Sequence, residues 1–139
     1  MAHCCRGRII RTAVAVAVTM MSSACDRSPA EKYARLIEQS AGWAATGTYV
    51  EELRQQRYVP GAYVNDVINE GSLETRQLHQ SLGESRDVPA DVRDRAAALN
   101  DQLSQQFAAA AHTGELDVER LRLLYRALRA LADSVRASR

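Results

Sequence analysis

From Ser28 onward, apolar side chains recur every three or four positions, and no segment alternates apolar and polar residues with a period of two. The first spacing places side chains on one face of an α-helix, whereas the second is typical of a half-buried strand. Turn-forming and helix-capping residues divide this region into four such segments. Because a helix with one apolar face must bury it against other helices, the sequence predicts an all-α fold. The default arrangement is a small antiparallel bundle of about four helices.

The first two segments meet at Pro60-Gly61. The first begins at Ser28-Pro29, where a capping serine precedes a proline suited to the first helical position. Its expected core face comprises Tyr33, Leu36, Ile37, Ser40, Trp43, Ala44, Gly47 and Val50. The face expected for the second segment, which ends at Gly83, comprises Val64, Val67, Ile68, Gly71, Thr75, Leu78 and Leu82. Since Gly71-Ser72 can interrupt a helix, this segment fits either one kinked helix or two short ones.

The last two segments are joined by a short turn. The third opens at Pro89 and ends at Gly114, and the fourth begins at Asp117, with Leu116 and Leu121 placed as a hydrophobic staple. The third presents Val92, Ala96, Leu99, Leu103, Phe107 and Ala110 on one side. The fourth presents Leu121, Leu124, Leu128, Leu131 and Val135. Residues 84–88 are mostly polar and are expected to connect the second segment to the third.

The first 24 residues have the layout of a secretory signal. Three arginines (Arg6, Arg8 and Arg11) precede an uncharged run over residues 12–21, and Ser22-Ser23-Ala24 forms a small-residue exit. This run is shorter than the roughly 20 residues needed to cross a bilayer. The sequence therefore predicts a signal peptide over residues 1–24, a linker over 25–27 and the helical domain over 28–139.

Ser22-Ser23-Ala24-Cys25 resembles the lipobox of bacterial lipoprotein precursors, although an apolar residue is usual at the place of Ser22. The resemblance implies cleavage before Cys25, attachment of diacylglycerol to its sulfur, and further acylation of the new amine by a chain such as palmitate. It also implies a periplasm-facing protein of the cell envelope, with the membrane as a partner through its lipid anchor. In enteric lipoproteins, an aspartate in the place of Asp26 resembles a signal for retention at the inner membrane. Ordinary signal cleavage after Ala24 is the alternative, because Ser22 and Ala24 fit the small-x-small rule.

Charge and cysteine content restrict the other partners. The formal net charge is +1, and without the three leader arginines the chain has 15 basic and 17 acidic residues. A domain so close to neutral has no global attraction for nucleic acid, which is not an expected partner. Of the three cysteines, only Cys25 lies outside the predicted leader, so a disulfide or a cysteine-based zinc site within the domain is not expected.

Two charged faces are candidates for contact with a partner. Arg122, Arg126, Arg129 and Arg136 fall on one side of the fourth segment, where they could contact lipid phosphates or an acidic envelope protein. The alternative is a solvated face with internal ion pairs. Asp66, Glu70 and Glu74 form an acidic side of the second segment, which either pairs with arginines of a neighbour or is solvated.

Trp43, the only tryptophan, is followed by Tyr49, Tyr58 and Tyr63. Such amphipathic rings favour boundaries between apolar and wet regions, so Trp43 could line a ligand surface or pack in the core with its edge hydrogen-bonded.

No glycine-rich phosphate loop, nucleophile elbow or haem-attachment motif occurs in the sequence. We therefore expect no catalysis, no metal and no cofactor. The leading hypothesis is a membrane-tethered lipoprotein that acts as a non-catalytic binding or structural accessory. The alternative is a periplasmic bundle that binds a small apolar or amphipathic ligand between its helices.

Overall fold

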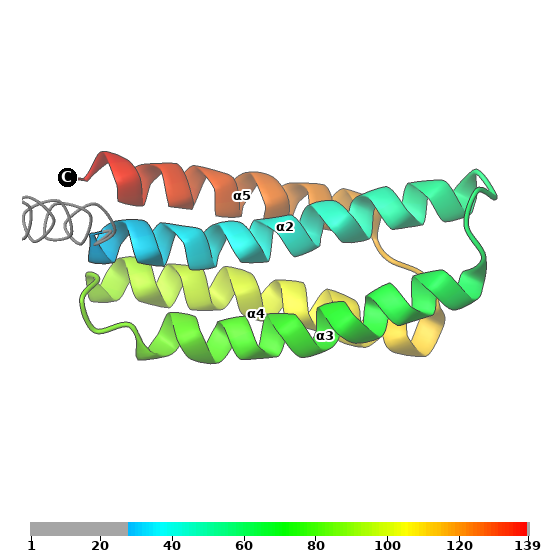
Figure 1. The fold of residues 1–139 in the computed structure, drawn as a ribbon, viewed down its shortest axis with the longest axis horizontal. Coiled ribbons are helices and arrows are strands. Elements are labelled where there is room, and N and C mark those ends of the chain that lie inside the picture. The colour runs from blue at the N-terminus through cyan, green and yellow to red at the C-terminus, as the bar shows by residue number, and fades with distance from the viewer. Residues whose placement is uncertain (1–27, 139) are drawn as a thin grey trace, which may run out of the picture.

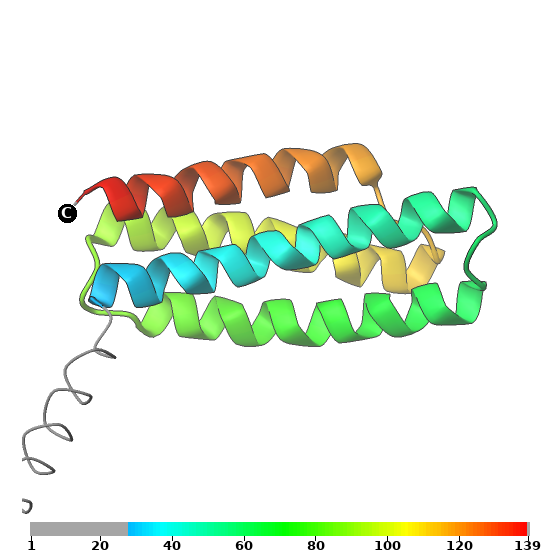
Figure 2. The same cartoon turned by 45° about the horizontal axis from the view of Figure 1, so that its top comes forward.

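The computed structural model describes residues 28–138, which form an all-α bundle (Figure 1). The helices are α2 (Pro29–Gln55), α3 (Gly61–Glu84), α4 (Ala90–Thr113) and α5 (Val118–Ala137). Successive helices run in opposite directions, and the two views agree on this arrangement (Figures 1 and 2). Helix α2 packs against both α3 and α5, and α4 packs against the same two helices. The prediction of a four-helix antiparallel bundle is confirmed for this part of the chain.

Helix ends follow the expected local chemistry. The Ser28 hydroxyl accepts a hydrogen bond from the Glu31 amide at 3.3 Å, and the Asp117 carboxylate accepts one from the Arg120 amide at 3.0 Å. Gly114, after α4, has φ = 75°, and its amide donates to the Ala110 carbonyl at 2.7 Å. This left-handed conformation ends helices at little cost in glycine, which has no Cβ to clash.

The end of α2 also has a residue in the left-handed conformation, but this residue is not a glycine. Arg57 has φ = 61°. Its amide donates to the Arg54 carbonyl, and the Tyr58 amide donates to the Leu53 carbonyl, both at 2.9 Å. These two bonds define a Schellman motif, whose left-handed position is strained for a residue with a side chain.

We expect Arg57→Gly to raise the free energy of unfolding by about 1 kcal/mol, because glycine removes the left-handed strain. Urea denaturation followed by circular dichroism would measure the shift in the midpoint. Gln56→Gly is the matched control, because Gln56 has φ = −82° in the right-handed region. This substitution relieves no strain and should not raise the free energy of unfolding. If both substitutions changed the free energy of unfolding by the same amount, the backbone of Arg57 would not be strained.

The observed core largely follows the predicted faces. All seven predicted positions of α3 are buried, and Gly71-Ser72 lies within one uninterrupted helix. In α5 the predicted leucines and Val135 are buried, together with Ala132. Leu36, Trp43, Val92 and Leu99 are only partly buried. Helix α2 also ends several residues earlier than its proline, and α3 extends one residue past Gly83.

Gly71 explains why α3 continues through a glycine. A Cβ on Gly71 would lie only 2.5 Å from Cε1 of Phe107, whose ring is fully buried. The ring of α4 therefore fits into the notch left by the missing side chain. Close packing, not helix termination, accounts for this residue.

A buried polar bridge links three helices at mid-length. The Ser40 hydroxyl of α2 donates to Oδ1 of Asn100 in α4 at 2.8 Å, and Nδ2 of Asn100 donates to the Thr75 carbonyl in α3 at 2.6 Å. The Thr75 hydroxyl donates to the Gly71 carbonyl at 2.7 Å. All three side chains are fully buried, and each has a partner. Such satisfied groups avoid the cost of burying an unpaired polar atom.

Candidate functional site

The predicted leader, Cys25 and Asp26 lie outside the described residues. Within residues 28–138, no helix has the length and apolar character needed to span a membrane. The same residues hold no group of three or more histidine, cysteine or acidic side chains arranged to bind a metal ion.

Three of the four α5 arginines face glutamates of α2. Nη1 of Arg129 lies 2.7 Å from the Glu38 carboxylate, which Arg136 also contacts at 2.5 Å. Arg122 contacts the Glu52 carboxylate at 2.5 Å. These ion pairs join α5 to α2, so the predicted arginine face is partly occupied by contacts inside the bundle.

The remaining pairs of this face lie within α5. Arg122 also contacts Glu119, and Asp133 lies 3.6 Å from Arg136. Arg126 is exposed; its Nε donates to the Arg122 carbonyl at 3.4 Å, and it forms no ion pair within residues 28–138. Arg126 is thus the member of the predicted set that is left for an external acidic group.

The electrostatics agree with this geometry. A hydrogen bond from Arg136, helped by the charges of Arg136 and Arg129, lowers the pKa of Glu38 despite some desolvation. The hydrogen bonds that Arg122 donates to Glu52 and Arg136 donates to Glu38 raise the pKa values of these two arginines. The ion pairs are half-exposed and screened by water, so they serve chiefly to orient α5 on α2.

Glu51 is a buried acidic residue that the helical pattern did not reveal. Its side chain is 1 % exposed, and both carboxylate oxygens lie 3.0 Å from Nε of Arg54. The amide of Leu116, in the turn between α4 and α5, donates to Oε2 of Glu51 at 3.5 Å. Burial alone would raise the pKa of Glu51, but the bonds from Arg54 and Leu116 outweigh it, so the pKa lies below its ordinary value.

Because the folded-state pKa of Glu51 is lowered, its contribution to stability is present above the ordinary glutamate pKa of 4.5 and is lost as the pH falls through the folded-state value. We expect Glu51→Gln to lower the free energy of unfolding by about 1 kcal/mol at neutral pH. The difference from the native chain should shrink as the pH falls below the ordinary value of 4.5, because the unfolded chain then takes up the proton before the folded chain does. Denaturation curves of both chains, recorded from neutral to acidic pH, would measure this difference in the free energy of unfolding. A difference that did not change with pH would contradict a lowered pKa of Glu51.

Trp43 borders a shallow groove between α2 and α3. The groove has a volume of about 320 Å³ and is lined by Gln39, Gly42, Trp43, Thr46, Glu74 and Leu78. The half-buried indole also packs edge-on against Phe107, with ring centroids 6.1 Å apart. One part of Trp43 therefore packs on the core and another borders the groove, and its role in binding a ligand stays a prediction.

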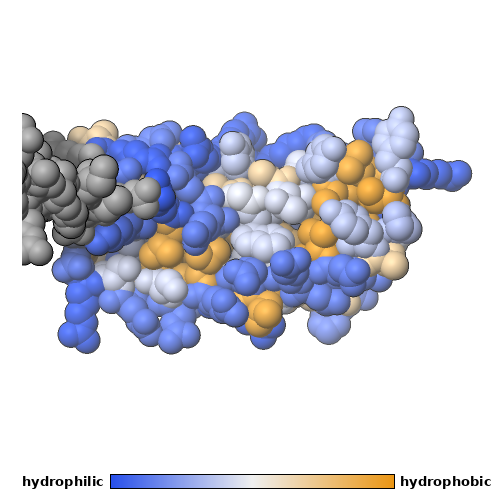
Figure 3. All heavy atoms as spheres, in the orientation of Figure 1, coloured by the Kyte–Doolittle hydropathy of each residue, from blue (hydrophilic) through white to orange (hydrophobic). Residues whose placement is uncertain are grey.

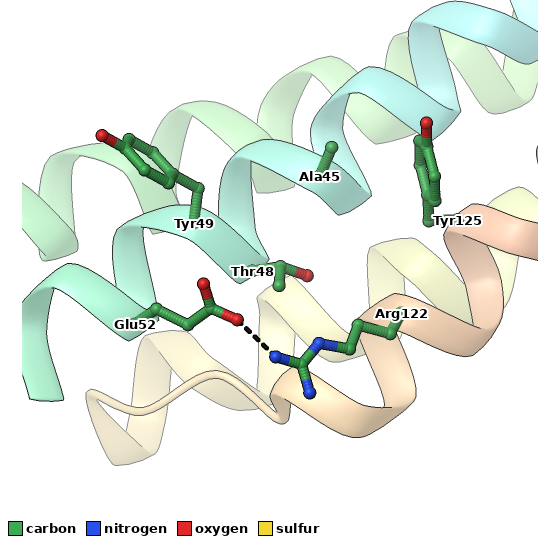
Figure 4. A pocket seen from close by; sticks show the side chains of 6 residues that line it. All are labelled: Ala45, Thr48, Tyr49, Glu52, Arg122 and Tyr125. Carbon is green, nitrogen blue, oxygen red and sulfur yellow. Dashed lines mark hydrogen bonds and ion pairs between the residues drawn. The ribbon is translucent and has the colours of Figure 1, made fainter.

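A second groove lies on the other side of α2, against α5 (Figure 4). It has a volume of about 220 Å³ and is lined by Ala45, Thr48, Tyr49, Glu52, Arg122 and Tyr125. In Figure 4 the two tyrosines stand on either side of Ala45, and the Glu52–Arg122 ion pair closes one end. The sequence signal for this site was Tyr49 near Trp43, but nothing in the sequence showed that Tyr125 would lie beside it.

The other predicted aromatic and acidic residues are solvent-facing. Tyr58 and Tyr63 are 74 % and 49 % exposed. Asp66 and Glu70 are exposed, Glu74 is half-buried, and none of the three forms an ion pair within the described bundle. The acidic side of α3 is therefore not neutralised by its neighbouring helices.

Comparisons of the chain with known protein families, with curated proteins and with solved structures found no match. The class of protein is therefore defined by its fold, an antiparallel bundle of helices over the described residues.

Proposed function

We propose that the chain is a lipid-anchored protein of the bacterial cell envelope and that its bundle is a non-catalytic binding or structural accessory. The observation that carries the proposal is the position of Cys25, which follows a small-residue exit and precedes the helix cap Ser28 by three residues. Three extended residues reach about 10 Å at most. An acylated Cys25 would therefore hold the start of α2 close to the bilayer.

The two ends of the bundle would lie at different distances from this anchor. The start of α2 and the end of α5 lie at one end, and the α2–α3 and α4–α5 connections lie toward the other (Figures 1 and 2). Helix α2 has 27 residues, which corresponds to a length of about 40 Å. Tyr58, in the α2–α3 connection, would thus lie at the end of the bundle opposite the anchor.

The acidic residues and the tyrosine with shifted pKa values have structural roles in the bundle. Glu38 and Glu51 hold neighbouring segments together through ion pairs and hydrogen bonds. Burial raises the pKa of Tyr33 to about 12, and its hydroxyl donates to the Leu82 carbonyl at 3.3 Å. These groups are engaged in packing α2 against its neighbours.

Radiolabelled palmitate incorporation in bacterial cells tests the anchor. We expect label on the native chain and none on Cys25→Ala. Cys4→Ala and Cys5→Ala are matched controls, because both cysteines precede the proposed cut, and these variants should remain labelled. A native chain without label would overturn the anchor. Fractionation of Asp26→Ser cells would test sorting, with movement from the inner membrane expected if Asp26 acts as the retention signal.

The groove beside Trp43 favours a second candidate function, binding of a small apolar or amphipathic ligand. A bundle with this function should gain thermal stability when envelope lipid extract is added, because a ligand of the folded state stabilises it by mass action. An accessory that binds only protein should gain none. Trp43 fluorescence would report binding in the same experiment, with the Cys25→Ala chain separating ligand binding from anchoring.

A further inference from the structure

The outward side of α2 is an uncharged helix face. Residues 39–50 contain no charged side chain, and within them Gly42, Ala45, Thr46 and Tyr49 are exposed. The two grooves lie on either side of these residues, toward α3 and toward α5. In Figure 3, a band of pale and orange surface crosses the middle of the molecule, with blue surface on both sides. We call the exposed side of residues 39–50 the α2 face.

The two borders of the α2 face carry unpaired charges of opposite sign. On the α3 border, Glu70 is exposed and lies one helical turn from Glu74, which lines the groove beside Trp43. On the α5 border, Arg126 is exposed and follows Tyr125, which lines the other groove. Neither Glu70 nor Arg126 forms an ion pair within residues 28–138.

These two charges lie at similar heights along α2. Glu74 is level with Gly42 and Thr46, and Glu70 lies one turn further toward the C-terminal end of α2, because α3 is antiparallel to α2. Tyr125 is level with Ala45 and Tyr49, and Arg126 is the next residue. Both charges therefore lie near the height of Gly47, within about one turn of 5.4 Å.

This arrangement is self-complementary under one particular symmetry. A twofold axis parallel to α2 places the two α2 faces against each other with their α2 helices running in the same direction. The α3 border of one copy then meets the α5 border of the other at the same height. Glu70 of each copy then faces Arg126 of its partner. An axis perpendicular to α2 would instead place Glu70 near the acidic border of the second copy, and like charges in contact are costly.

We propose that two copies of this chain associate in parallel through the α2 face, with Glu70 of one copy paired with Arg126 of the other. Residues 39–50 of α2 span about 18 Å, and the two flanking helices, α3 and α5, each lie about 9 Å from α2, so the face has a projected area of at most roughly 300 Å² per copy. Stable complexes bury about 800 Å² per partner. The dimer should therefore be reversible.

Sedimentation velocity over a range of concentrations tests the proposal, using the chain as the cell makes it, purified in non-ionic detergent. The native chain should show a monomer–dimer equilibrium. Glu70→Arg and Arg126→Glu should each raise the dissociation constant at least about tenfold, because each places two like-charge contacts in the symmetric dimer. Asp101→Arg is the matched control: it makes the same charge change as Glu70→Arg on an exposed position of α4 and should leave the equilibrium unchanged.

Mixing the two weakened variants gives the sharpest result. In a mixed dimer, the arginine introduced by Glu70→Arg in one copy faces the glutamate introduced by Arg126→Glu in the other, and the native Glu70 and Arg126 face each other at the second contact. The mixture should therefore recover a dimer that neither variant forms alone, and the double variant should recover it by itself. Thr46→Glu should disrupt every combination, since the two copies of residue 46 meet near the axis. A monomeric native chain, or no recovery in the mixture, would overturn the proposal.

Discussion

Leu128→Asp is expected to unfold the bundle. Leu128 is fully buried in the middle of the apolar face of α5. The substitution removes roughly 2 to 3 kcal/mol of apolar burial and leaves an aspartate in the core with no cationic partner, at a cost of several more. The total is comparable with the roughly 5–15 kcal/mol that stabilises a typical domain. Far-ultraviolet circular dichroism should show loss of the helical signal.

Leu123→Asp is the matched control for this change. Leu123 lies on the same helix but is 52 % exposed, so the same substitution leaves the new carboxylate in water and should change the free energy of unfolding by less than about 0.5 kcal/mol. A folded Leu128→Asp chain with native helicity would mean that the assigned face of α5 is not the core.

The second large effect is expected at Gly71. Adding one methyl group in Gly71→Ala places a Cβ within 2.5–2.8 Å of three atoms of the Phe107 ring, a separation that requires the ring or the helices to move. Overpacking of this kind costs about 1–3 kcal/mol or more, against roughly 1 kcal/mol gained from the better helix propensity of alanine. We expect a net loss of about 2 kcal/mol, measured by urea denaturation.

Gly42→Ala should raise the free energy of unfolding, in contrast to Gly71→Ala. Gly42 is also inside a helix, but a Cβ there would meet nothing within 4 Å, so only the propensity gain of about 1 kcal/mol applies. Phe107→Leu provides a second comparison, because a smaller side chain at 107 should reduce the cost of Gly71→Ala in the double variant. Stabilisation by Gly71→Ala would rule out the proposed tight contact.

Much of this fold follows from the sequence because one physical rule, burial of a helical stripe, governs most of the chain. The stripe of α3 from Val64 to Leu82 and the leucines of α5 were predicted from spacing alone and are buried. The caps Ser28 and Asp117 and the terminator Gly114 act through local hydrogen bonds, which depend on a few adjacent residues. Local rules of this kind need no knowledge of the neighbouring helices.

The features that the sequence did not reveal depend on which helices become neighbours. Glu51 and Asn100 are polar residues whose burial is acceptable only because Arg54, Ser40 and Thr75 supply their hydrogen bonds. The arginines of α5 formed a recognisable side, but their pairing with Glu38 and Glu52 required α2 to pack beside α5. Gly71 was predicted as a possible helix interruption because the contact that explains it is made by Phe107, 36 residues away in the sequence.

The hydrogen-bonded bridge of Ser40, Asn100 and Thr75 has a consequence for the register of the helices. Apolar stripes can slide along one another by one helical turn, about 5.4 Å, and still bury their leucines and alanines. Such a shift would separate the Asn100 amide from the Ser40 hydroxyl or from the Thr75 carbonyl and leave a buried polar group without a partner, at a cost of roughly 1–3 kcal/mol. We therefore expect this single asparagine to set the heights of α2, α3 and α4 relative to one another.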